Sequence, residues 1–90
     1  MHGAGFQGRA EIGQLLIAHG INPSDKHTDG FQPIQRACWG RERRHYETVK
    51  MFLSNNVWNA EIHESCLTSP NAATKRLIQE YAARNKNKEL

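Results

Sequence analysis

Two cysteines and two of the histidines in this sequence could hold a zinc ion or form a nucleophilic pair. They are Cys38, His45, His63 and Cys66. Structural zinc sites usually contain Cys-x-x-Cys pairs, and this chain has one His-x-x-Cys and no such pair. A catalytic cysteine needs an accessible thiol beside a base. Both cysteines stand at small-residue positions of predicted short helices, where a thiol packs as an apolar group. We therefore expect no metal site and no catalytic residue.

Other patterns that carry chemistry are also missing from the sequence. No glycine-rich loop of the P-loop or dinucleotide-binding type occurs, so we expect no cofactor. Glu11 and Glu47 fall at predicted helix starts, where the helix dipole stabilises a carboxylate. That position favours a structural role over acid–base catalysis. The sequence therefore predicts a protein that is not an enzyme.

Composition limits the kinds of protein that remain. A chain of 90 residues suits one small domain, and its formal charge of +3 is modest. No stretch approaches the roughly 20 apolar residues of a membrane span, and no basic segment followed by an apolar run opens the chain as in a signal peptide. Two cysteines are too few for a disulfide framework. We therefore predict reduced thiols, an intracellular location (cytoplasmic or nuclear) and no membrane partner.

Two segments, 11–19 and 45–56, carry apolar residues at helical spacing. The first is followed by Gly20, which favours a left-handed helix end. The second closes on Asn56, the other residue type that tolerates this conformation. Both segments are therefore predicted to be amphipathic helices.

Shorter signals mark the rest of the chain. Residues 21–32 are rich in turn-forming residues, and a helix of about two turns is predicted over 33–40 with Pro33 at its first position. A last helix is predicted to begin with Ser69 as its N-cap and Pro70 as its first residue. A helix as short as 33–40 is unstable alone, so neighbours must cover both of its sides.

The predicted helices repeat. The long ones correspond at an offset of 36 residues, which aligns Glu11 with Glu47, Leu16 with Phe52, Ile17 with Leu53, Gly20 with Asn56 and Ile21 with Val57. The short ones correspond through "IQRAC" at 34–38, "IHESC" at 62–66 and, more loosely, "MHGAG" at 1–5. Repetition at this period indicates stacked helix pairs. We predict one domain over 1–83, with units 1–23, 24–57 and 58–83, and a polar tail over 84–90.

The ordered set of residues in these units resembles the ankyrin repeat. The residues that match its pattern are Asp29, Gly30, Pro33, Ile34, Ala37, Cys38, Glu47, Val49, Phe52, Leu53, Ile62, His63, Ser65, Cys66, Leu77 and Ile78. The resemblance implies an all-α solenoid of antiparallel helix pairs with one long turn or hairpin loop. Gln32 and Gln35 stand where the family has threonine and histidine, so its usual turn hydrogen bonds are not expected here.

The third unit departs further from the family pattern. About eight turn residues are missing between Val57 and Ile62, so its hairpin is not expected. Trp58 is predicted to fill the space that this hairpin leaves.

The resemblance also implies a function, because ankyrin arrays usually bind other proteins through their turns and short helices. On that basis the predicted partner-binding residues are Asp25, Lys26, His27, Asp29, Phe31, Gln35, Arg36 and Trp39. Tryptophan and arginine are enriched at binding hot spots. Trp39 could instead cover the edge of the stack, with its indole N–H bonded to a carbonyl or water.

Two further interpretations remain open from the sequence. Arg36, Arg41, Arg43 and Arg44 could bind nucleic acid or another polyanion, which a steep fall of affinity with salt would reveal. The chain could also be a structural segment of a longer array, or pair end to end with another copy. Independently of these interpretations, apolar surface is expected at the N-terminal face of the stack, around Phe6 and Ile12.

A stack this short is expected to have low thermal stability. Three units are about the minimum for a repeat array, and each buries its apolar face only against its neighbours. We expect the isolated monomer to melt below about 80 °C, a value well above the usual range for mesophilic domains. Circular dichroism during heating measures this, and a higher transition would contradict the expectation.

Overall fold

The computed structural model describes residues 9–24, 26 and 30–88. Phe6, the 1–5 segment and three of the predicted binding residues (Asp25, His27 and Asp29) lie outside this part of the chain. The described residues form helices α2 (Ala10–Ala18), α3 (Pro33–Cys38), α4 (Arg43–Ser54), α5 (Ala60–Cys66) and α6 (Ala72–Lys88), and they contain no strand. The all-α fold class is therefore confirmed.

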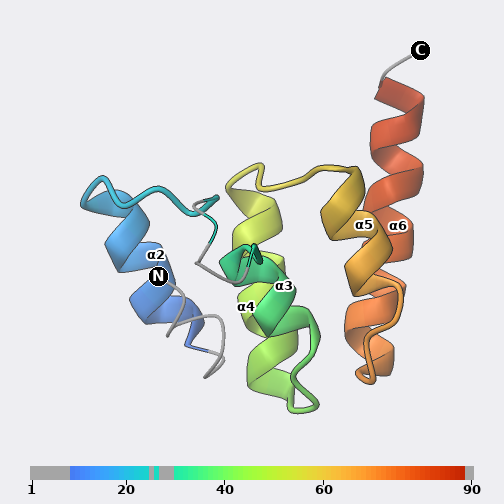
Figure 1. Cartoon of the computed structure of the whole chain (residues 1–90), viewed down its shortest axis with the longest axis horizontal. Helices are drawn as coiled ribbons and strands as arrows, with labels where there is room; N and C mark the ends of the chain where they lie inside the picture. The colour runs from blue at the N-terminus through green and yellow to red at the C-terminus, as the bar shows by residue number, and fades with distance from the viewer. Residues whose placement is uncertain (1–8, 25, 27–29, 89–90) are drawn as a thin grey trace.

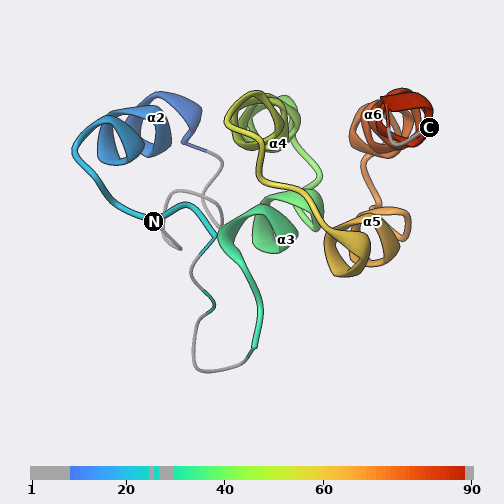
Figure 2. The same cartoon turned by 90° about the horizontal axis from the view of Figure 1, so that it is seen from above.

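The helices lie in two rows (Figures 1 and 2). Seen from above, α2, α4 and α6 form one row, and the shorter α3 and α5 form the other. Contacts join consecutive helices, α3 to α4 and α5 to α6, and also neighbours within a row, α2 to α4, α4 to α6 and α3 to α5. The two helices that repeat at an offset of 36 residues, α2 and α4, are thus side by side.

The short helix α3 is covered on several sides. Its residues Ile34, Ala37 and Cys38 are completely buried, in a core that also contains Val49, Phe52, Leu53, Val57, Ile62, Cys66 and Ile78. These residues come from α3, α4, α5, α6 and the turn after α4. Because α3 contacts both α4 and α5, the tertiary packing supplies the stability that a helix of this length lacks alone.

The predicted helix ends are right in some places and wrong in others. Gly20 and Asn56 have φ of 91° and 63°, the left-handed conformation expected after the two long helices. However, α4 begins at Arg43, two residues before the predicted helical segment 45–56. The backbone N–H of Glu42 donates to His45 Nδ1 at 3.3 Å, which ties the start of α4 to the preceding residue.

The start of α6 was also predicted too early. The helix begins at Ala72, and Asn71 caps it by accepting a hydrogen bond on Oδ1 from the Thr74 N–H at 3.4 Å. The Ser69 hydroxyl donates instead to the Cys38 carbonyl and accepts from the Asn71 N–H at 3.1 Å. Ser69 therefore links the loop before α6 to the end of α3. At its other end, α6 continues to Lys88, into the predicted polar tail.

The clearest correction concerns the cysteines. Cys38 and Cys66 form a disulfide, with their Cα atoms 5.3 Å apart, whereas the sequence predicted two reduced thiols. Both residues occupy the same position in adjacent short helices, and these helices pack side by side, so their inward-facing sulfurs meet. The intracellular location was inferred partly from reduced thiols, because disulfides persist mainly in oxidising compartments. Reduced thiols were one of the two observations behind the predicted intracellular location, and they no longer support it.

The disulfide should contribute a large part of the stability. It closes a loop across a sequence separation of 28 residues, for which the chain-entropy model gives about 3.5 kcal/mol. Reduction should therefore lower the melting temperature by more than about 10 °C for a domain of this size. The matched control is the Cys38→Ala/Cys66→Ala variant, which reductant should leave unchanged. Equal melting of the oxidised and reduced wild type would contradict this role.

Candidate protein-interaction surface

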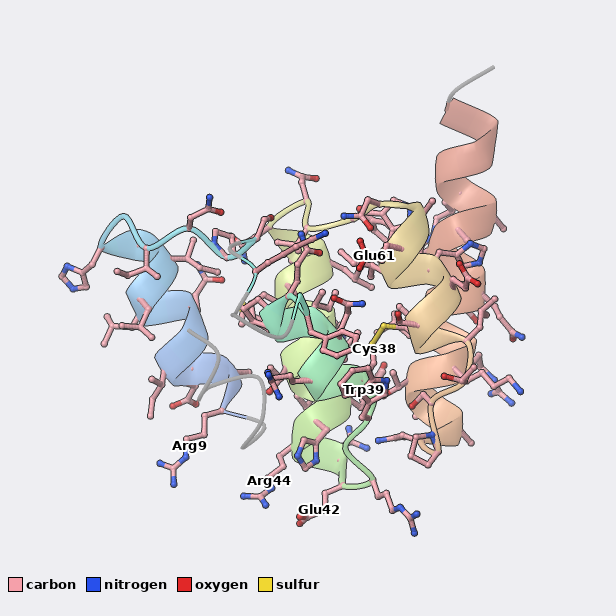
Figure 3. The ribbon with its side chains drawn as sticks, in the orientation of Figure 1. Arg9, Cys38, Trp39, Glu42, Arg44 and Glu61 are labelled. Carbon is pink, nitrogen blue, oxygen red and sulfur yellow. A yellow bond between two sulfur atoms is a disulfide. The ribbon has the colours of Figure 1, made fainter. Side chains whose placement is uncertain are left out.

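Trp39 is the largest exposed side chain of the predicted binding set. It follows α3 directly, is 39% exposed, and contacts Phe31 edge to face with ring centroids 4.9 Å apart. Phe31 is half-buried and comes from the end of the turn before α3. Figure 3 places Trp39 at the end of α3, next to the disulfide at Cys38. The turn and the short helix thus combine into one aromatic patch.

Lys26, in the turn before α3, makes an ion pair with the next helix pair. Its ammonium nitrogen lies 3.1 Å from Glu61 Oε2, and both side chains are about half exposed, at 51% and 48%. Glu61 belongs to the first turn of α5 (Figure 3), so the ion pair joins the turn before α3 to the next helix pair. An exposed pair of this kind adds little stability, but it limits the positions that the turn can adopt.

Gln35 has to be removed from the predicted contact set. Its side chain is 0% exposed, so it cannot contact a partner that docks on this surface. Its Oε1 accepts a hydrogen bond from the Gln32 N–H at 2.7 Å, and its Nε2 donates to Ser65 Oγ at 2.9 Å. Gln35 therefore holds the start of α3 and links α3 to α5. Sequence reasoning missed this because Gln35 was assigned to the binding set from the family's use of its turns and short helices, which does not say which side of α3 each residue occupies.

Gln32 makes the second part of the same network. Its Nε2 donates to the Ser24 carbonyl at 3.0 Å, and its Oε1 accepts from Asn59 Nδ2 at 3.4 Å. The two glutamines thus supply hydrogen bonds at the turn where the family threonine and histidine are absent. The sequence analysis questioned only the family's usual bonds at this turn and did not foresee these, which form because the longer glutamine side chain of Gln32 reaches Ser24 and Asn59.

Two residues of the predicted arginine cluster form ion pairs with acidic side chains. Arg41, Arg43 and Arg44 are exposed, while Arg36 is half-buried. Arg43 lies 3.4 Å from Glu47 and Arg44 lies 2.8 Å from Glu42, measured between guanidinium nitrogen and carboxylate oxygen. Two of these arginines therefore have a nearby carboxylate that offsets their charge. This arrangement weakens the case for a continuous polyanion site.

The two remaining candidates for chemistry, His63 and His45, are occupied in packing. His63 lies against Trp58, with ring centroids 5.5 Å apart, and Trp58 also contacts Tyr81 at 4.9 Å. The His45 ring packs so closely on Gly40 that a Cβ there would collide with it. In the part of the chain that the structure describes, no three His, Cys, Asp or Glu side chains are grouped to bind a metal ion. The same residues include no helix that is long and apolar enough to cross a membrane.

Comparison with known proteins does not assign the chain to a family. No protein-family model matches this sequence, and no solved structure matches the chain. The candidate surface therefore depends on the geometry of its own residues.

The Gln35 network can be tested by removing its polar groups. A Gln35→Leu substitution keeps similar bulk but leaves the Gln32 N–H and the Ser65 hydroxyl without this partner. We expect a loss of about 1–3 kcal/mol in the free energy of unfolding, the usual cost of unpaired buried polar groups. Urea denaturation measures it. Gln79→Leu, at an exposed position of α6, is the control and should change stability by less than about 0.5 kcal/mol.

Proposed function

We propose that this chain is an ankyrin-type array of helix pairs that binds another protein and catalyses no reaction. The proposal is supported by the pairing of short with long helices and by the contacts between neighbours in each row. It is also supported by the match of the Asp29–Cys38 segment to the family pattern in the sequence. Fold alone does not determine function, so the binding role depends on the surface residues.

The single observation that carries the binding role is the exposed aromatic pair. Trp39 remains 39% exposed although Phe31 packs against it, and this contact joins the end of the turn before α3 to the residue that follows α3. Aromatic side chains with arginine nearby are the composition that protein interfaces favour at their centre. We name Lys26, Phe31, Arg36 and Trp39 the Trp39 surface.

The Trp39 surface is held by fixed neighbours. The disulfide at Cys38 fixes the end of α3, the Gln35–Ser65 hydrogen bond joins α3 to α5, and Lys26 pairs with Glu61. A surface that is already ordered loses less conformational entropy when a partner binds. Trp39 is therefore placed to bury its ring against a partner without rearrangement of the helices.

A polyanion-binding function is the alternative. It would use Arg36, Arg41, Arg43 and Arg44, of which Arg43 and Arg44 have carboxylates beside them. The two functions differ in their salt dependence, because each phosphate contact makes affinity fall as salt rises. If the chain instead has only a structural role and completes a longer array, no binding partner should depend on Trp39.

Affinity capture with the oxidised chain separates these functions. The wild type, Trp39→Ala and Leu15→Lys are compared as baits in extracts of the source cells. Leu15 is exposed on α2 and is the control, since it lies outside the Trp39 surface. We expect Trp39→Ala to lose at least about tenfold in recovery of a protein partner, which corresponds to about 1.4 kcal/mol. Leu15→Lys should retain that partner.

The salt series decides between the two kinds of partner. Recovery should change little between about 50 and 200 mM salt if the partner docks on the Trp39 surface, and should fall steeply for a polyanion. Circular dichroism of Trp39→Ala confirms that its helices are intact. Equal recovery of every partner by the wild type and Trp39→Ala would exclude the proposed surface.

A further inference from the structure

The two cysteines of the disulfide are completely buried. Cys38 and Cys66 are both 0% exposed, and Figure 3 shows their bond between α3 and α5, beside Trp39. Thiol–disulfide exchange begins when a thiolate contacts one of the two sulfurs, so its rate depends on access to them. A reductant cannot make that contact while α3 is packed on α5. Reduction of the folded chain therefore requires these two helices to separate first.

The contacts that hold α3 on α5 are short-range ones. Ile34 of α3 and Ile62 of α5 are buried in the same core. Gln35 Nε2 of α3 donates a hydrogen bond to Ser65 Oγ of α5 at 2.9 Å. The two helices have six and seven residues, so each depends on such contacts for its stability. Removal of the Gln35–Ser65 bond should therefore increase the population in which the helices are apart.

Reduction makes the packed arrangement less favourable. Two thiols carry two more hydrogen atoms than a disulfide and have no bond between their sulfurs, so they need more room. A well-packed core accommodates added volume only by shifts of the surrounding groups. Because the site of Cys38 and Cys66 has no exposed surface, the added volume acts directly on the contact between α3 and α5.

The Trp39 surface depends on the same contact between the two helices. Trp39 directly follows Cys38 at the end of α3. Lys26, another residue of this surface, pairs with Glu61 of α5 at 3.1 Å. Separation of α3 from α5 therefore changes the position of Trp39 relative to Lys26, and it removes the covalent link that holds the end of α3.

We propose that the redox state of Cys38 and Cys66 controls the Trp39 surface, which is assembled in the disulfide form and released from α5 in the dithiol form. The reductant is a dithiol. One of its thiolates attacks a cysteine sulfur and the other cysteine leaves; the second thiol of the reductant then displaces the first cysteine and closes the reductant's own disulfide. Two electrons and two protons pass to the cysteine pair. The inference rests on the proposed binding function, because the surface that it controls is the one proposed to bind a protein.

Acrylamide quenching of Trp39 fluorescence tests the state of the surface without a partner. Trp58→Phe leaves Trp39 as the single tryptophan, and it is compared before and after reduction by excess dithiothreitol, well below the melting temperature. We expect the quenching constant to rise roughly twofold, because the side chain is only 39% exposed in the oxidised chain. Circular dichroism should retain most of the helical signal, since α4 and α6 keep their own contact. The same variant with Cys38→Ala and Cys66→Ala is the control, and dithiothreitol should not change its quenching.

The rate of reduction tests the separation of the helices. Free thiols are alkylated at intervals after addition of dithiothreitol and counted by mass spectrometry. Gln35→Leu and Ser65→Ala, which each remove the hydrogen bond between α3 and α5, should be reduced at least about fivefold faster than the wild type, the factor that about 1 kcal/mol gives. Gln79→Leu, at an exposed position of α6, is the matched control and should be reduced at the wild-type rate.

Three results would overturn the proposal. An unchanged quenching constant would show that the surface is the same in both redox states. Loss of the whole helical signal on reduction would show that the chain unfolds and does not release one helix. Equal rates of reduction for the wild type, Gln35→Leu and Ser65→Ala would show that the reductant does not wait for α3 to leave α5. Failure of the binding function is a separate result, because it is measured by affinity capture with the oxidised chain.

Discussion

Packing of the short helix α3 against both α4 and α5 is the contact on which the rest of the structure depends. The helix has six residues, too few to persist in water, and its apolar side chains are completely buried by its neighbours. Once α3 is held, the turn before it, the aromatic pair that Phe31 and Trp39 form across its two ends and the cysteine at its end take fixed places. The candidate binding surface is thus produced by the same burial that stabilises the helix.

Polar groups inside this packing join α3 to α5 and to the loop before α6. Gln35 reaches Ser65 on α5, while the hydroxyl of Ser69 and the amide of Asn71 reach carbonyl groups at the end of α3 and just beyond it. Buried polar groups are costly when unpaired, so these bonds favour one register of the two short helices over alternatives. Together with the disulfide, they give this half of the molecule both covalent and polar links between its helices. The α2 end lacks comparable covalent and polar links among the described residues, and it is also where apolar side chains remain exposed.

Much of the helical arrangement could be predicted from the sequence, because it follows from local periodicity. Leu16 and Phe52 sit at equivalent places in a repeat, and that repeat correctly indicated which long helices lie side by side. The environments of single residues were harder to predict. Gln35 was expected on the binding surface from the family resemblance, whereas its side chain is buried with hydrogen bonds to the Gln32 N–H and to Ser65. The disulfide was missed although the alignment of "IQRAC" with "IHESC" already placed both cysteines at one position of adjacent helices. Helix starts at Arg43 and Ala72 depend on which side chain captures a free backbone N–H, a competition that residue types alone do not decide.

The disulfide also determines how the molecule carries a load. Because it joins α3 to α5, the whole of α4 lies within the loop that it closes. Tension applied to the two ends of the oxidised chain passes from one short helix to the other through sulfur, and the intervening segment bears none of it. The bridged cysteines are 28 residues apart in the sequence, which corresponds to about 95 Å of extended chain at about 3.4 Å per residue. This length cannot be pulled out until a reductant cleaves the disulfide.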